Sequence, residues 1–185
     1  MQYTRVANDA FEKIQINAGI MVSSFTPATG AIGSIMGATT GGFSFSANPT
    51  YEDFGEEVDN VPPNTWQMKR VRCYDPAASG SFVTVSAALA GQLSGAGTVA
   101  DGHIVPTHSL TAADFDDVWI VGDYSANNEG EGAGYVAIHI MHALNTGGFQ
   151  WQTAKDGKGK FAFDFHGHYD LNDIDTAPYE IYIRG

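Results

Sequence analysis

Short runs of alternating apolar and polar residues, separated by turn-forming residues, constrain the fold of this chain more than any other feature. Side chains alternate between the two faces of a β-strand, so such runs are typical of strands with one buried face. Alternation or β-branched content marks residues 14–22, 43–46, 81–85, 118–121, 135–142, 149–153, 160–169 and 179–183. Twenty-two glycines, with frequent Ser, Thr, Asn and Asp, supply turns between them. The sequence therefore predicts a mainly β protein.

Two turn signals lie near the C-terminal end. Asn-Thr-Gly-Gly at 145–148 and Asp-Gly at 156–157 are typical of β-hairpin turns. Because these turns separate the last four predicted strands, we expect those strands to form a meander, in which each strand pairs with the next.

One segment, residues 86–95, has a helical pattern. Ser86 is a favourable N-cap, Leu89 and Leu93 are four residues apart and share one helix face, and Gly95 can end the helix. We therefore expect a β-sandwich or barrel with one flanking α-helix. A chain of 185 residues can bury one core, so residues 1–185 are predicted to form a single domain.

Two predicted connections are too long for simple hairpin loops, and long loops in compact domains usually have a function. Residues 23–42 are neutral and rich in Gly and Thr, whereas residues 48–64 are acidic. No charged residue or histidine occurs from Ile14 to Tyr51, and residues 77–100 also carry no charge. Charge depletion is typical of the core of a protein–protein interface, although a buried strand pair with a Gly/Ser-rich loop would also explain it. We predict an assembly loop that includes Thr26, Pro27, Gly30, Gly33 and Gly37.

The chain is strongly acidic, with 21 Asp and Glu against nine Lys and Arg and a net charge of −12. This balance disfavours nucleic-acid binding, which needs basic residues to displace counterions from phosphates. Five carboxylates lie within eight residues, at Glu52, Asp53, Glu56, Glu57 and Asp59. A solvated surface explains such a cluster, and so does pairing with another subunit. The densest basic source for that pairing is Lys155, Lys158 and Lys160.

The segment KGKFAFDFHGHYDL is the one place where catalytic or metal-binding residues gather. On a strand, Asp164, His166, His168 and Asp170 would share one face, and two imidazoles with two carboxylates can bind a transition metal or transfer protons. The phenylalanines between them form an apolar opposite face, which is typical of any strand with one buried and one solvated side. We therefore predict that these four residues are structural, and that the chain binds no metal.

Other chemistry is also not expected. The sequence contains no G-x-S-x-G, H-E-x-x-H or Walker A pattern, so we predict no enzyme, no catalytic residue and no cofactor. Cys73 is the only cysteine, which excludes an intrachain disulfide. Neither uncharged stretch predicts a membrane span, because polar residues, Gly and Pro interrupt the apolar ones. The N-terminus has no apolar signal-peptide core, so we expect synthesis in a reducing cytoplasm.

Several segments resemble one protein family. IGSIMGATTGGFSFSANPTYEDFGEEVDNVPPNT is similar to the long segment of major tail tube proteins from long-tailed, non-contractile bacteriophages of the siphovirus type, in particular those of phages and prophages of Gram-positive bacteria. The similarity continues in order through SGSFVTVSAAL, DFDDVWIVGDYS, GYVAIHIMHALNTGGF, GKFAFDFHGHYDL and PYEIYI. It covers the chain from about Ile14 onward, whereas residues 1–13, an N-terminal arm, show no clear match.

The resemblance implies a β-sandwich with a flanking helix whose copies form six-fold rings. The rings stack into a tail tube, which serves as a conduit for DNA ejection, and long loops reach the next ring. The implied partners are the chain itself, the tape measure, tail terminator and distal tail proteins, and passing DNA that does not stick to an acidic lumen. The implied location is the virion, after synthesis in the host cytoplasm. The acidic cluster at residues 52–59 would then lie in the lumen or between rings, and its long loop favours the contact between rings.

Two alternatives stay open. One is a carbohydrate-binding β-sandwich that uses Trp66, Trp119 and Trp151 as stacking platforms, although Trp151 alternates with glutamines as a core residue would. The other is a metal-dependent enzyme that uses the face with His166 and His168.

Overall fold

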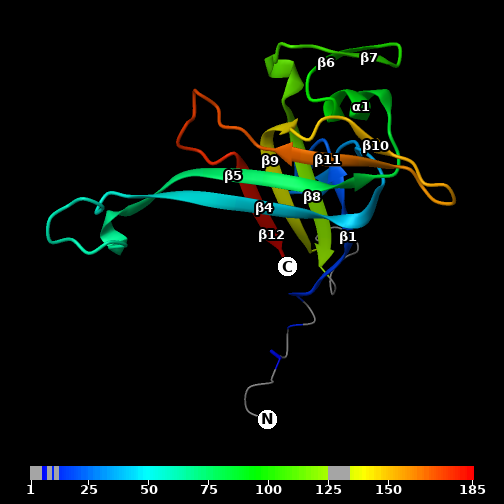
Figure 1. The fold of residues 1–185 in the computed structure, drawn as a ribbon. Coiled ribbons are helices and arrows are strands. Elements are labelled where there is room, and N and C mark those ends of the chain that lie inside the picture. Colours follow the sequence, from blue (N-terminus) through cyan, green and yellow to red (C-terminus); the bar gives the residue numbers. More distant parts are fainter. Residues whose placement is uncertain (1–5, 8–9, 11–12, 125–133) are drawn as a thin grey trace.

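The protein is described here by a computed structural model, which covers residues 6–7, 10, 13–124 and 134–185. As predicted, the described chain is mainly β with one α-helix (Figure 1). Its main sheet has eight strands and consists of two halves that face each other across the core. No helix of the described residues is long and apolar enough to span a membrane.

The first half-sheet contains four antiparallel strands in the order β1-β8-β9-β12. These are β1 (Gln15–Val22), β8 (Asp116–Tyr124), β9 (Tyr135–Asn145) and β12 (Tyr179–Arg184). Residues 118–121 of β8 are all buried, because both faces of this half-sheet are covered near its centre. That is why this strand appears in the sequence as a continuous apolar run rather than as an alternation.

The second half-sheet has the order β4-β5-β11-β10 and lies across the first in Figure 1. Its strands are β4 (Thr39–Asp53), β5 (Lys69–Phe82), β10 (Gln150–Gln152) and β11 (Lys160–His166). The two halves join where Asn145 and Leu144 of β9 pair with Phe165 and His166 of β11.

The predicted meander is correct only in part. The β10–β11 hairpin forms around Asp156 and Gly157, as the turn signal indicated. However, β12 pairs with β9 instead of β11, because residues 167–178 return the chain to the first half-sheet. In addition, no residue pair joins β9 to β10 in the described chain.

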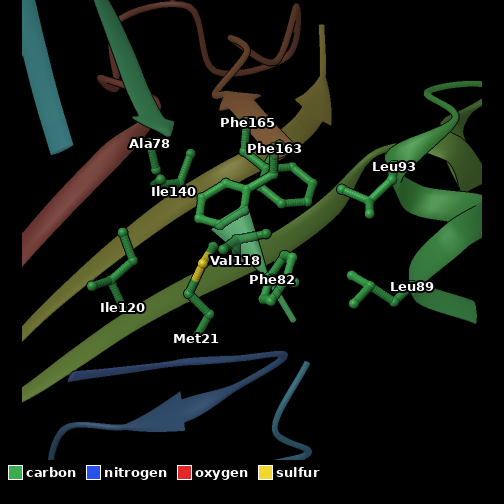
Figure 2. Packing of buried hydrophobic residues seen from close by; sticks show 11 residues of the cluster. Met21, Ala78, Phe82, Leu89, Leu93, Val118, Ile120, Ile140, Phe163 and Phe165 are labelled. Atoms are coloured by element: carbon green, nitrogen blue, oxygen red, sulfur yellow. The ribbon is translucent and has the colours of Figure 1, made fainter. Parts of the chain in front are cut away.

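The core lies between the half-sheets and is closed at one end by α1 (Ala87–Leu93) (Figure 2). Phe82 of β5 and Phe163 of β11 have ring centroids 4.7 Å apart. Phe165 is buried beside them, which confirms the apolar face predicted for this strand. Each such phenylalanine contributes about 1.5–3 kcal/mol through burial of its side chain.

The helix α1 begins where the sequence predicted. Ser86 Oγ accepts a hydrogen bond of 3.1 Å from the backbone N–H of Leu89, which satisfies one of the free donors at the helix N-terminus. Leu89 and Leu93 are both buried against the core. A short hairpin of β6 (Gly97–Ala100) and β7 (His103–Pro106), which the sequence analysis missed, follows the helix and contacts it.

A second apolar cluster covers the other face of the first half-sheet. Its cover is a small hairpin of β2 (Phe25–Thr26) and β3 (Ala31–Ile32). The Phe25 ring lies 4.9 Å from the Tyr135 ring and 5.6 Å from the Trp119 ring. The predicted loop 23–42 is thus shorter than expected, since β2 and β3 form within it and β4 begins at Thr39.

The strands β4 and β5 are much longer than predicted and project from the body (Figure 1). From residue 47 to residue 76 they pair only with each other, and we call this segment the arm. The arm includes the whole predicted loop 48–64, of which residues 48–53 belong to β4. The sequence did not reveal these strands because Asn48, Pro49 and charged residues are unfavourable in strands and no buried face imposes alternation.

Candidate assembly surfaces

The four residues that were weighed as a metal site and predicted to be structural separate into two unconnected groups. Asp164 and His166 lie together on the side of β11 opposite its buried phenylalanines. His166 Nδ1 lies 3.0 Å from Asp75 Oδ1, and its Nε2 lies 3.4 Å from Asp164 Oδ2. Since Asp75 belongs to the base of the arm, His166 links the arm to β11.

His168 and Asp170 lie beyond β11, which ends at His166 instead of continuing to residue 169. His168 Nδ1 is 3.0 Å from the carbonyl oxygen of His142. The Asp170 carboxylate accepts hydrogen bonds from the backbone and side-chain N–H groups of Asn172, and the backbone bond in particular lowers the pKa of Asp170. Throughout the part of the chain that the structure describes, no three His, Cys, Asp or Glu side chains are placed to hold a metal ion.

A third histidine lies on the outward face of the first half-sheet, and the sequence analysis did not single it out. The His139 ring stacks on Trp119 with centroids 4.0 Å apart. Its Nε2 lies 3.4 Å from Asp117 Oδ2 and its Nδ1 lies 3.6 Å from Glu180 Oε2, which connects β8, β9 and β12. The strand register sets this arrangement, so no local sequence pattern indicates it.

The two outer strands of the first half-sheet, β1 and β12, form its edges. Among the described residues β12 pairs only with β9, whereas β1 pairs with β8 and, at its C-terminal end, Val22 also forms an isolated antiparallel bridge with Ile35. On β12, Ile181 and Ile183 are 54% and 65% exposed and point to the same side as Ile138 and Val136, their partners on β9. The edge strand thus shows both unpaired backbone groups and apolar side chains to solvent.

The acidic cluster lies at the outer end of the arm. Glu52 Oε2 is 3.9 Å from Arg70 of the opposite strand, and the Asp53 carboxylate accepts from the backbone N–H groups of Gly55 and Asn64 at 2.9 Å each. The other three carboxylates lie in the turn and have neither an ion pair nor a side-chain hydrogen bond within the described chain; they are Glu56, Glu57 and Asp59.

The predicted basic counterparts lie at the opposite end of the molecule. Lys155, Lys158 and Lys160 are exposed on the β10–β11 hairpin, and none forms an ion pair with a described residue. In Figure 1 this hairpin turn and the outer end of the arm lie on opposite sides of the body. A contact between the two groups therefore needs two copies of the chain.

The three tryptophans have different environments. Trp119 is 7% exposed and packs in the second apolar cluster, whereas Trp66 in the arm and Trp151 on β10 are 79% and 64% exposed. The expectation that Trp151 is a core residue is wrong, because β10 is a short edge strand that pairs only with β11. The Trp151 ring stacks instead on Phe161, with centroids 6.2 Å apart.

The predicted assembly loop folds back on its own half-sheet. The Pro27 carbonyl accepts a hydrogen bond of 2.6 Å from the Tyr135 hydroxyl, and Thr26 lies in β2. A Cβ at Gly33 would lie 2.2 Å from Ser24 Oγ, and one at Gly37 would lie 3.0 Å from the Phe82 ring, so a side chain at either position would require its neighbour to move. Gly30 has a φ of +73° in the turn between β2 and β3. The role of this loop in assembly stays a prediction.

Comparisons with known proteins give matches in structure and none in sequence. No family model matches the chain, and no curated protein matches it. One solved chain, from a structure described as the virion of a native gene transfer agent particle, aligns with 91% of this chain and 96% of its own length. The identity is 7% and the TM-score is 0.45. A similarity of this size does not define the function.

Proposed function

We propose that this chain is a structural virion protein whose copies form six-membered rings that stack into a phage tail tube, a conduit for DNA ejection. The observation that supports this proposal most is the pair of edges on the first half-sheet, since in the described chain β12 has an open edge and β1 is bridged on its outer side only near Met21 and Val22. Its four strands alternate in direction, so β1 and β12 run in opposite directions. The β12 strand of one copy can therefore pair with β1 of the next copy in the antiparallel manner, and the half-sheets of several copies can close into one barrel.

The composition of the edges favours such pairing. Natural proteins protect exposed edges with lysine, proline or bulges, because an apolar free edge promotes association. β12 has neither Lys nor Pro, and it exposes Ile181 and Ile183. β1 lies in the uncharged stretch and does contain a bulge between Ile16 and Ile20, which would set the register of an incoming strand.

In such a barrel, the outward face of the first half-sheet, together with the β2–β3 hairpin that covers part of it, would line the lumen, because the second half-sheet covers the opposite face. Strand register places Asp117, Asp123 and Glu180 on this outward face, together with Arg184. Three carboxylates against one guanidinium give each copy a net negative contribution. A negative wall repels DNA phosphates, so the double helix would pass without binding.

The further partners of the proposal come from the family resemblance. They are the tape measure, tail terminator and distal tail proteins, with DNA as a transient passenger. The proposal includes neither an enzymatic activity nor a cofactor, and it places the chain in the virion after synthesis in the host cytoplasm.

No specific observation favours the alternatives. A carbohydrate platform would bring aromatic rings together, but Trp66 and Trp151 belong to opposite ends of the molecule and Trp119 is buried. A metal-dependent enzyme would need converging ligands, but His166 and His168 each bind a different partner.

Native mass spectrometry of the purified chain tests the proposal. Concentrated protein should contain species of six copies of the 19.7 kDa chain and multiples of six. The double substitution I181K/I183K should leave folded monomers, since it places two charges along the β12 edge. The matched control L171K/I174K changes two exposed apolar residues outside the edge strands and should assemble. Monomeric wild-type protein at every concentration would contradict the proposal.

A further inference from the structure

The outer end of the arm exposes an unusual number of apolar side chains. We define the arm tip as residues 54–68, between the last paired residues of β4 and β5. Phe54, Val58, Trp66 and Met68 are all exposed there, and Trp66 is among the most exposed large side chains described. Several exposed apolar side chains on one projecting element are typical of an interaction surface.

The arm tip is ordered before any partner binds. The Asp53 carboxylate fixes both ends of the turn through the N–H groups of Gly55 and Asn64. Lys69 Nζ donates a hydrogen bond of 2.6 Å to Asn64 Oδ1, and Thr65 Oγ1 donates one of 2.7 Å to the Pro62 carbonyl. Because these bonds already fix the turn, docking would lose little conformational entropy.

The negative charges of the arm tip restrict which kind of surface can bind it. The tip contains Glu56, Glu57 and Asp59 and no Lys or Arg, which gives it three negative charges. Lys69 donates to Asn64, and Arg70 lies over the Phe54 ring and pairs with Glu52, so neither basic residue pairs with Glu56, Glu57 or Asp59. A surface that receives the tip should therefore combine apolar groups with positive charge.

The β10–β11 hairpin has this combination. Trp151 and Phe149 are exposed and flank the Phe161 ring, at centroid distances of 6.2 Å and 6.0 Å. The turn between the strands contains Lys155 and Lys158, with Lys160 directly after it and Asp156 as the only acidic residue. In the described chain, no other group of neighbouring basic residues occurs outside the arm.

The two surfaces cannot meet within one molecule. β5 separates them, because its first residue Lys69 adjoins the arm tip while its last residue Phe82 pairs with Phe161 of β11. A strand of 14 residues spans about 45 Å at roughly 3.3 Å per residue.

We propose that the arm tip of one copy docks on the β10–β11 hairpin of the next copy. The Trp66 ring packs against Trp151 and Phe149, while Glu56 and Glu57 pair with Lys158 and Lys160. Two different surfaces then join at each contact, and such a heterologous contact repeats from copy to copy until it closes a ring or extends a filament. This inference rests on the proposed self-assembly and identifies one of its contacts.

Charge exchange between two variants tests the contact. E56K/E57K changes the net charge from −12 to −8, and K158E/K160E changes it from −12 to −16. Each variant alone should need at least about tenfold more protein to assemble, since two pairs become repulsive. An equimolar mixture should assemble again, because each reversed tip then meets a reversed hairpin.

Controls separate the contact from general charge effects. D173K/D175K makes the same change of net charge in an exposed loop outside both surfaces and should assemble as the wild type does. W66S should weaken assembly without any rescue by mixing. Normal assembly of E56K/E57K alone would overturn the contact and leave the proposed function intact, and so would a mixture that fails to recover.

Crosslinking provides a second readout. In a C73S background, chains with E56C and chains with K158C should form disulfide-linked dimers when mixed under oxidation, whereas E56C and D173C should not. Equal crosslinking in both mixtures would overturn the contact. Wild-type protein that stays monomeric and lacks the specific crosslink would overturn the proposed function and the contact together.

Discussion

At the scale of single residues, Phe165 shows how strongly the core depends on one side chain. It is 2% exposed and packs among residues of both half-sheets (Figure 2). Phe165→Ala should lower the free energy of unfolding by about 3–5 kcal/mol, because it leaves a cavity that rigid strands cannot close. Leu171→Ala, at an 89% exposed position, should change it by less than about 0.5 kcal/mol. Urea denaturation of both variants measures the difference, and equal effects would contradict the packing described.

Tyr182 provides a prediction about pH. Its hydroxyl donates a hydrogen bond of 2.5 Å to Glu180 Oε2, and this bond raises the pKa of Tyr182 above the ordinary value of 10.0. The neutral phenol is thus favoured in the folded state. Its stabilising contribution is fully present below about pH 10 and is lost as the pH rises through the raised pKa.

Tyr182→Phe should therefore lower the free energy of unfolding at pH 8. Between pH 9 and pH 12, this free energy should fall less in the variant than in the wild type. Chemical denaturation across this range measures both effects. Tyr51→Phe, which removes an exposed hydroxyl of the arm, is the matched control. An alkaline loss in Tyr182→Phe as steep as that of the wild type would exclude the role of this hydrogen bond.

The histidines show how far single residues could be predicted from sequence. Alternation correctly placed Asp164 and His166 on one face, opposite Phe163 and Phe165. It could not place Asp75, which reaches His166 from 91 positions away through the pairing of β5 with β11. For the same reason, the sequence did not indicate the contacts of His139, whose carboxylate partners come from two other strands.

At the scale of elements, prediction succeeded where burial imposes a pattern. The helix α1 and the strands β8, β9 and β11 all have a buried face, and each was predicted within a few residues. The strand β12 was predicted as closely, although its residues are only partly buried or exposed. Most of β4 and β5 was missed because the outer part of the arm is largely exposed, so no buried face imposes an alternating pattern on its sequence. The predicted assembly loop is anchored on the first half-sheet by Phe25.

Removal of the arm tip tests whether the rest of the protein folds without this element. Replacement of residues 54–68 by Asn-Gly would connect Asp53 to Lys69, which already pair, through a favourable two-residue turn. Because the tip contributes no side chain to either buried cluster, the midpoint of thermal unfolding should change by only a few degrees. Circular dichroism measures this midpoint, while native mass spectrometry should show loss of the large assemblies.

An unfolded deletion variant would place the arm tip in the folding core and contradict its description as a projecting element. A folded variant that still assembles normally would show that the arm is not needed for contacts between copies.

At the scale of the whole molecule, features that are costly in a monomer become useful in an assembly. The outer edge of β12 pairs with no strand of the described chain, the arm tip exposes apolar side chains, and the lysines of the β10–β11 hairpin form no ion pair there. In the proposed assembly, each would meet a complementary surface on another copy: β1 for β12, and the β10–β11 hairpin for the arm tip. The net charge of −12 would keep such copies apart until these specific contacts form, and it would oppose retention of DNA.

Negative-stain electron microscopy of the purified, concentrated chain tests the proposed assembly most directly. Hollow tubes built from stacked six-fold rings are the expected result, with a stain-filled lumen and no bound DNA. Small particles of single-chain size at every concentration would contradict a tube-forming role.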